Sequence, residues 1–224
     1  MNNLSRQYND FAENFSQQQS ADYNYVSKKH FYRTVGKLRA GAKVLDLGCG
    51  DATDLRYLSK YKICPFGLDA SKKMIDPAKR IMSTATITLG VFEKIPFNAY
   101  SFDHVISKYA LQTSQDIERI YREVNRVLKK SGSFTFLVAH PTRHFMEKRK
   151  KGKNYFQQEI VNSPILFAKK IIVREPSHTF NEYLSPYFLQ HFDVISFTEA
   201  ADPTVEQIGG DLYPGFVVIK AIKR

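Results

Sequence analysis

The sequence predicts an α/β sandwich built on a mostly parallel sheet. Apolar, strand-like runs alternate with helical patterns between residues 43 and 139, and the last run is continuously apolar, as in a sheet covered on both faces. The length of 224 residues suits one such domain, and 43% hydrophobic with 25% charged residues is an ordinary globular composition. Disorder is therefore not expected for the bulk of the chain.

Helices are predicted before the first strand. Leu4, Tyr8, Phe11 and Phe15 recur every three or four positions, as the residues of one helix face do. Residues 23–38 form a second helical stretch. We expect apolar faces of this kind to pack on the rest of the domain.

Strands and helices then alternate. The predicted strands are residues 43–47, 63–68, 86–89, 102–107 and 133–139, and the predicted helices are residues 51–60, 71–83 and 114–130. Ser71 has the side chain of an N-cap, and Gly132 is a stop signal after the third helix. Such alternation implies βαβ units with right-handed crossovers.

The pattern changes after residue 140. Residues 180–190 are predicted to be a helix, and residues 192–197 and 215–222 strands that form a closing antiparallel pair. Between residues 141 and 174, nine basic residues face two acidic ones, so most of the formal net charge of +11 belongs to one region. Such a region invites a nucleic-acid or membrane-surface interpretation.

The most informative stretch is residues 44–53, VLDLGCGDAT, where a strand ends in a Gly-x-Gly turn and a helix begins. Gly48 and Gly50 let the backbone turn tightly and approach a ligand closely. Asp69 lies 19 residues beyond Gly50, at the end of the second strand. A carboxylate there can accept both ribose hydroxyls of an adenosine.

Two ligands, a dinucleotide and S-adenosylmethionine (SAM), compete for this geometry. The dinucleotide pattern needs a third glycine where this chain has Thr53, and it places a diphosphate at the helix N-terminus. Asp46 and Asp51 flank the turn, and their charge would oppose a diphosphate. SAM has no phosphate and carries a positive sulfonium and amino group, so the acidic turn favours SAM.

The same residues resemble a known family. The Asp-x-Gly-x-Gly turn of residues 46–50 with Asp69 resembles the first two motifs of the class I SAM-dependent methyltransferases, and residues 90–97, 101–106 and 128–132 resemble its later blocks in order. The resemblance implies a Rossmann-like three-layer sandwich with a seven-stranded sheet, mostly parallel, and an antiparallel C-terminal strand. It also implies an enzyme that moves the methyl group of SAM to a small organic acceptor by in-line displacement, releasing S-adenosyl-L-homocysteine.

The resemblance further implies which residues contact the cofactor. They are Asp46, Gly48, Cys49, Gly50, Asp51, Asp69, Ala70, Met74, Val91, Phe92, Glu93, Ser107 and, from an N-terminal lid, Tyr8. The family often has an Asp near the adenine where this chain has Val91. Adenine recognition is therefore expected to rest on backbone groups and on apolar packing by Val91 and Phe92.

A sulfonium methyl is already a strong electrophile, so the family needs no universal catalytic residue. The catalytic candidates are His140 after the fifth predicted strand, Tyr109 after the fourth, and His178 beside a possible cap at Thr179. Each has a structural alternative, as a satisfied strand-end histidine, ordinary packing or a loop histidine. Cys49 is interpreted as a small residue in a tight place, and no metal site is predicted.

The resemblance gives one domain with four parts: a helical lid at residues 1–40, a SAM-binding core at 41–140, a basic inserted cap at 141–178, and a C-terminal helix and strands at 179–224. Short matches in the insert resemble small-molecule methyltransferases of the ubiquinone and menaquinone biosynthesis type. The run KRKKGK at residues 148–153 is either a solvated loop or a site for an anionic acceptor, a carrier protein, a membrane surface or RNA.

The expected partner is therefore a small-molecule acceptor, with an anionic one among the alternatives. Methylation of RNA or protein through the insert, and a non-catalytic SAM-binding protein, stay open, as does the oligomeric state. The first ten residues lack the apolar core of a secretory signal, and no apolar run approaches the ~18 residues that cross a bilayer. A cytoplasmic location is expected.

Overall fold

A seven-stranded sheet forms the centre of the computed structural model, which describes residues 3–12, 25–148, 151–165, 171–201 and 213–224. The strand order is β3-β2-β1-β4-β5-β9-β8. The strands are β1 Lys43–Leu47, β2 Cys64–Asp69, β3 Thr86–Leu89, β4 Phe102–Lys108, β5 Leu128–Ala139, β8 Phe192–Ala200 and β9 Phe216–Lys223. The first five are parallel, and β9 is antiparallel to both β5 and β8. This confirms the predicted fold class.

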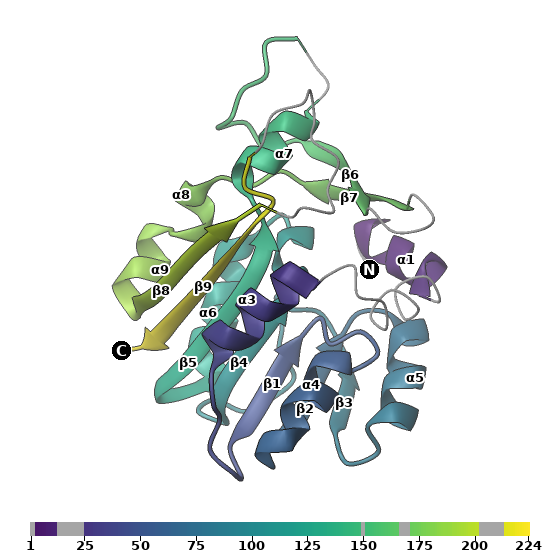
Figure 1. Cartoon of the computed structure of the whole chain (residues 1–224), viewed down its shortest axis with the longest axis vertical. Coiled ribbons are helices and arrows are strands. Elements are labelled where there is room, and N and C mark those ends of the chain that lie inside the picture. Colours follow the sequence, from purple (N-terminus) through teal and green to yellow (C-terminus); the bar gives the residue numbers. More distant parts are fainter. Residues whose placement is uncertain (1–2, 13–24, 149–150, 166–170, 202–212) are drawn as a thin grey trace.

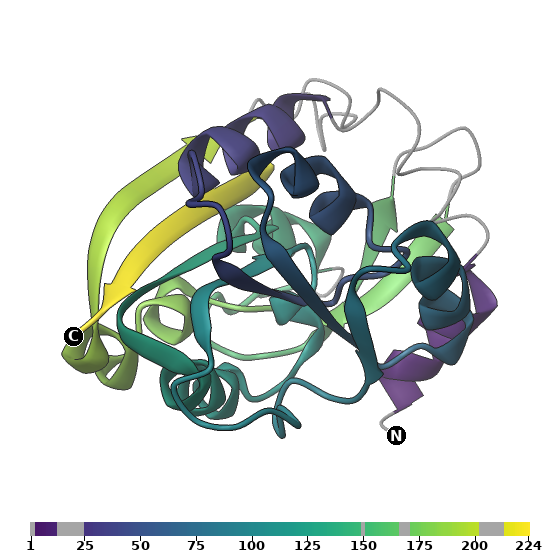
Figure 2. The ribbon, with the colours of Figure 1, turned by 90° about the horizontal axis from the view of Figure 1, so that it is seen from below.

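Helices cover both faces of the sheet, as Figure 2 shows. One layer contains α3 (Tyr25–Val35), α4 (Thr53–Leu58), the 3₁₀ turn η2 (Ser59–Tyr61) and α5 (Lys72–Ile81). The other contains α6 (Ile117–Val127), α8 (Phe180–Tyr183) and α9 (Pro186–His191). Ser71 caps α5 as predicted, since its Oγ accepts a hydrogen bond from the backbone N–H of Met74.

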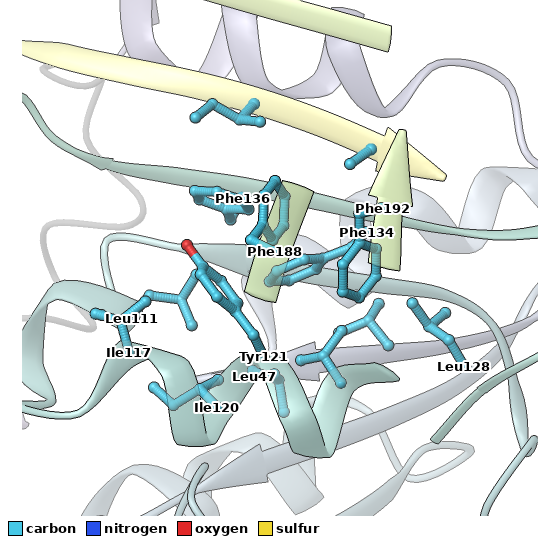
Figure 3. Packing of buried hydrophobic residues seen from close by; sticks show 14 of the residues in the cluster. Leu47, Leu111, Ile117, Ile120, Tyr121, Leu128, Phe134, Phe136, Phe188 and Phe192 are labelled. Carbon is cyan, nitrogen blue, oxygen red and sulfur yellow. The ribbon is translucent and has the colours of Figure 1, made fainter. Parts of the chain in front are cut away.

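The larger core cluster lies between α6 and the sheet (Figure 3). Tyr121 of α6 is fully buried against Phe134, Phe136 and Phe188, at ring-centroid distances of 4.7 to 6.2 Å. Its hydroxyl donates to the carbonyl of Tyr183, so the polar tip is satisfied inside the core. Burial of each such side chain contributes about 2 kcal/mol.

Two predicted helices have different ends in the structure. The helix predicted to run to residue 130 stops at Val127, because Leu128 already pairs with Phe102 as the first residue of β5. The helix predicted at residues 180–190 is two helices. It breaks at Ser185, whose side chain caps α9, with Pro186 at the first helical position.

The insert after β5 forms a unit of its own. Helix α7 (Pro141–Glu147) leads to a two-stranded antiparallel sheet, β6 (Ile160–Ile165) and β7 (Ile171–Pro176), which lies beyond the carboxyl ends of the central strands in Figure 1. Helix α1 (Asn3–Asp10) contacts both β7 and α5. Phe15, part of the predicted N-terminal helix face, lies outside the described residues. Among the helices that are described, none combines the length and apolar character of a membrane span.

Candidate functional site

The Gly-x-Gly turn lies at the carboxyl ends of β1 and β2. The backbone N–H of Gly48 donates to the carbonyl of Leu68 over 2.8 Å, which joins the turn to the end of β2. Gly48 has φ of +77°, and a Cβ there would lie 2.3 Å from the Cβ of Ala110 in the segment after β4. A glycine is required at this position for its backbone and for space.

Asp69 ends β2 with its carboxylate fixed by the backbone. Its Oδ2 accepts from the N–H of Gly50 at 2.9 Å and its Oδ1 from the N–H of Ser71 at 2.8 Å. Burial raises the pKa of Asp69, while the backbone donors act in the opposite direction. The carboxylate is held rigidly beside the glycine turn, as the ribose-binding role requires.

The start of α4 is closed to a diphosphate. Oδ1 of Asp51 accepts from both the backbone N–H and the hydroxyl of Thr53, at 3.1 and 2.8 Å. A helix N-terminus binds phosphate through such backbone N–H groups, and here a carboxylate already occupies one of them. The geometry therefore agrees with the sequence argument against a dinucleotide.

A buried acidic cluster lies next to the turn. Asp46 and Asp54 are almost fully buried, and Lys108 donates to Oδ1 of Asp54 at 2.6 Å, an oxygen that also accepts from the Tyr32 hydroxyl. Burial, and then the charge of Asp54, raises the pKa of Asp46 well above its usual range. Oδ2 of Asp46 has no hydrogen-bond partner among the residues that the structure describes. A cationic or N–H-bearing ligand would satisfy this oxygen.

The other predicted cofactor residues surround the same turn. Phe92 and Met74 lie against it, since their Cζ and Cε would be 3.4 and 3.0 Å from Cβ atoms added at Gly48 and Gly50. Ser107 is buried and donates to the Leu47 carbonyl. The remaining predicted residues, Cys49, Ala70, Val91 and Glu93, follow β1, β2 and β3 in the same edge region.

Tyr8 reaches this region from α1. Burial, followed by the carboxylates of Glu175 and Asp69, raises the pKa of Tyr8 well above its usual value. The phenol is therefore close enough to Asp69 and to Glu175 of the insert to sense both charges. Helix α1 connects the two halves of the candidate site.

Comparison with known proteins identifies this arrangement. Residues 45–136 match the profile of a methyltransferase domain family. The chain is 38% identical over 102 residues to the uncharacterised methyltransferase sll0829 of Synechocystis, and 33% identical over 115 residues to a demethylmenaquinone methyltransferase of Thermotoga maritima. This chain therefore contains a methyltransferase domain over residues 45–136.

The extent of these matches differs between sequence and structure. The two sequence matches cover 45% and 50% of this chain and 48% and 49% of the relatives, so the chain spans about half the length of those curated relatives. A Listeria monocytogenes protein described as a SAM-dependent methyltransferase superposes with a TM-score of 0.69 over 88% of this chain and 99% of its own, at 23% identity. That likeness extends the shared fold to the helices and strands outside the matched core.

His140, the first predicted catalytic residue, caps α7. Its Nδ1 accepts from the N–H of Thr142 at 3.0 Å, and its Nε2 lies 2.6 Å from Oε1 of Glu199 on β8. Burial lowers the pKa of His140, with Glu199 acting against it. Both ring nitrogens have partners, which agrees with the structural alternative of a satisfied histidine at the end of a strand.

Tyr109, the second predicted catalytic residue, directly follows β4. Its φ of +53° is left-handed, which is uncommon for a bulky residue and occurs at sites where backbone strain is tolerated. Its N–H donates to the Leu137 carbonyl, which anchors it between β4 and β5. The structure thus places Tyr109 at the carboxyl edge of the sheet. The next residue, Ala110, is the one that packs against Gly48 of the glycine turn.

His178, the third predicted catalytic residue, is buried shortly after β7. Its Nδ1 is 3.0 Å from Oε1 of Glu182, and its Nε2 is 3.1 Å from the carbonyl of Gln112 in the 3₁₀ turn η3 (Leu111–Thr113). Thr179 begins α8 with Glu182 in a capping box, as its sequence position suggested.

Sequence reasoning missed a buried polar network in the insert. Arg143 pairs with Glu147 at 2.9 Å, and His144 pairs with Glu175 at 3.2 Å. Although burial opposes it, the hydrogen bond from His144 holds the pKa of Glu175 below its usual value. Arg143 and Glu147 are four residues apart, a spacing that predicts an ion pair on one helix. This pair was overlooked because the surrounding residues are mostly basic.

The basic run KRKKGK is partly structural. Lys148 is buried and its ammonium donates to the carbonyls of Asn154 and Gln157, while Lys153 donates to the carbonyl of Met146. These two lysines close the loop after α7. Residues 149 and 150 lie outside the described part of the chain.

Proposed function

We propose that this chain transfers the methyl group of SAM to a small organic acceptor. The observation that carries the proposal is the acidic environment of the glycine turn, with one buried oxygen of Asp46 unpaired in the described structure. A ligand with positive charge and no phosphate complements this turn. SAM supplies a methyl group on a positively charged sulfur, which is electrophilic without further activation.

The residues at the turn bind and orient this cofactor. Asp69 accepts from the ribose hydroxyls, because its backbone donors hold its carboxylate in place. Asp46 accepts from the cationic amino group through its unpaired oxygen. Phe92 and Met74 pack against the adenine and the turn. The remaining requirement for the reaction is alignment of the acceptor and exclusion of water.

We place the acceptor at this edge of the sheet, next to the insert. Helix α1 and the β6–β7 sheet lie beyond the carboxyl ends of the central strands (Figure 1). The polar groups of the insert are buried, which suits a small polar molecule more than a polymer. The relationship to a demethylmenaquinone methyltransferase also supports a small-molecule acceptor. Tyr109, His140 and His178 are the proposed contributors to acceptor positioning or proton transfer.

Calorimetry tests the cofactor assignment. The protein is expected to bind SAM and S-adenosyl-L-homocysteine, and to bind NAD at least a hundredfold more weakly, since NAD carries a diphosphate. Asp69→Asn tests the ribose contact and should weaken SAM binding by about tenfold or more. Equal affinity for NAD, or an unchanged affinity in Asp69→Asn, would contradict the assignment.

Turnover tests the acceptor class. We expect S-adenosyl-L-homocysteine to form when the protein and SAM are mixed with a small-molecule fraction of cell extract. Nuclease or protease treatment of whole extract should leave the rate unchanged. Loss of turnover after nuclease would favour an RNA acceptor, and loss after protease a protein acceptor. SAM binding without turnover in any fraction would favour a non-catalytic role.

A further inference from the structure

His178 makes two hydrogen bonds whose partners can only accept. The carbonyl of Gln112 has no hydrogen to give, so Nε2 must donate to it. On the other side, Glu182 already accepts from the backbone N–H of Thr179 at 2.8 Å and from the side-chain amide of Gln158 at 3.0 Å. The other hydrogen-bond partners that the described residues give this carboxylate are all donors. Nδ1 of His178 therefore donates a hydrogen bond to Glu182 as well.

A neutral imidazole has one N–H, whereas an imidazolium has two. Only the protonated ring of His178 satisfies both contacts. Although burial opposes it, the hydrogen bonds from His178 and Thr179 hold the pKa of Glu182 below its usual value. The pair is therefore a half-buried carboxylate and a buried imidazolium, which form a charge-assisted contact of the stronger kind.

Other titratable groups face the ring from the elements around it. From α7, Nδ1 of His144 accepts the backbone N–H of His178 at 3.3 Å, and Nε2 of the same ring lies 3.2 Å from Oε1 of Glu175 on β7. From α8, the Tyr183 ring lies 5.4 Å away between centroids. Lys148, at the end of α7, is close enough to Glu182 to sense its charge. His178 thus joins η3, α7 and α8.

The turn that His178 holds contains an unpaired buried acceptor. The Gln112 side chain is buried, and its Oε1 has no hydrogen-bond partner in the described structure. The turn η3 follows β4 directly, two residues after Tyr109, and Ala110 in the same segment packs on Gly48. A buried carbonyl oxygen at this edge needs a donor, which the described residues do not supply and which a ligand would provide.

We propose that His178 is a positioning residue that stays doubly protonated and fixes η3, so that Oε1 of Gln112 accepts a hydrogen bond from an O–H or N–H group of the methyl acceptor. This inference deepens the proposed function and rests on it for its catalytic part. The acceptor class it names is an alcohol, phenol or amine that carries a hydrogen at or beside the atom that is methylated. The protonation state of the ring is independent of the reaction.

Nitrogen-15 NMR of histidine-labelled full-length protein tests the protonation state. The ring signals lost in His178→Gln are assigned to His178, and those displaced in the near-isosteric Glu182→Gln give a second assignment if the first variant does not fold. At pH 7 we expect two protonated ring nitrogens at His178. In Glu182→Gln the ring signals of His178 should move towards those of a singly protonated ring. One protonated and one bare nitrogen at pH 7 would overturn the proposal.

Kinetics test the catalytic part with the active extract fraction as acceptor source. Gln112→Leu keeps the size of the side chain but removes the carbonyl, and kcat/KM should fall 10- to 100-fold while the SAM Kd stays within twofold. Gln115→Leu, a nearby exposed glutamine, is the matched control and should match the wild type. An unchanged kcat/KM in Gln112→Leu would overturn the contact.

Glu182→Gln separates positioning from general support of the fold. Its kcat/KM should fall while the SAM Kd stays within twofold of the wild-type value. An unchanged kcat/KM in Glu182→Gln would overturn the positioning role. If SAM does not bind at all, the proposed function fails while the NMR result still decides the state of the ring.

Discussion

Gly48 shows how far a single residue can determine the site. Gly41 has nearly the same φ, +76° against +77°, but a Cβ at Gly41 would meet nothing within 4 Å, whereas one at Gly48 would collide with Ala110. Replacing each glycine by alanine would therefore separate two effects. One is the strain of a left-handed backbone, which costs about 1 kcal/mol, and the other is the loss of space for the new Cβ. Both effects apply at Gly48 and only the first at Gly41.

We predict that Gly48→Ala weakens SAM binding at least tenfold and lowers the melting temperature more than Gly41→Ala does. The reason is that Ala110 belongs to the backbone segment after β4 and can move only with it. Calorimetry and thermal unfolding of both variants provide the measurement. Equal effects of the two substitutions would show that the close contact does not matter.

Asp46 predicts a pH dependence of cofactor binding. Its pKa is raised by burial and by Asp54, so it takes up a proton at a higher pH than an ordinary aspartate. The proposed contact needs the ionised form, and SAM affinity should therefore fall on acidification, beginning above the usual aspartate range. In Asp46→Asn, calorimetry should find weaker SAM binding with this pH dependence reduced. An affinity of the wild type that is flat with pH would contradict the contact.

The sequence identified the residues that act locally and missed those that act at long range. Gly48, Gly50 and Asp69 belong to a motif with fixed spacing, so their role could be predicted. The partners of His178 lie 4 and 66 residues away, and no local pattern connects His178 to Gln112. The roles of Asp54 and Lys108 likewise depend on contact between separate elements.

At the scale of elements, α1 is attached to two different parts of the molecule. The Gln7 side-chain amide donates to the carbonyl of Arg174 at 2.8 Å and accepts from its N–H at 2.9 Å, as a neighbouring β-strand would. Oδ1 of Asn9 accepts from the hydroxyl of Ser71 at the start of α5. The insert and the cofactor edge are therefore coupled through one short helix.

We predict that Gln7→Ala releases α1 from β7. Two backbone groups of Arg174 lose their partner, so amide hydrogen exchange in residues 3–10 should accelerate by about tenfold, and dissociation of SAM should quicken. Asp10→Ala, an exposed change on the same helix, is the control. Equal protection of α1 in both variants would show that the Gln7 contacts do not hold the helix.

Element prediction succeeded where one periodicity dominated. The helix predicted at residues 114–130 is present as α6 because its apolar residues recur at helical spacing. Those within α6 are buried: Ile117, Ile120, Tyr121, Val124 and Val127. The strands of the insert were missed. Pro164 lies within β6, and a basic stretch precedes β7. Neither segment therefore has the alternation of apolar and polar residues that is typical of a strand.

At the scale of the whole molecule, cofactor binding should raise stability by linkage. A ligand at 100 times its Kd adds about 2.7 kcal/mol to the free energy of unfolding. For a chain of this size, that corresponds to a rise of roughly 5–10 °C in melting temperature. Thermal unfolding with SAM should show this shift, and NAD at the same concentration should give none. A shift with NAD alone would contradict the assignment of the site.

The topology of the sheet was predictable in outline only. Alternating strands and helices implied parallel neighbours, and the changed pattern after residue 140 implied a closing antiparallel pair, both of which the structure confirms. The position of β9 between β5 and β8 was not predicted, because local sequence contains no information about which edge a late strand joins.

That position has a consequence during synthesis. The ribosome completes β8 before β9, yet β8 pairs only with β9 in the described sheet. A nascent chain with β8 released and β9 still in the exit tunnel must keep the apolar flank of β5 uncovered. Chaperones can bind the chain during that interval, and a chain that stalls at that stage would be most prone to aggregate.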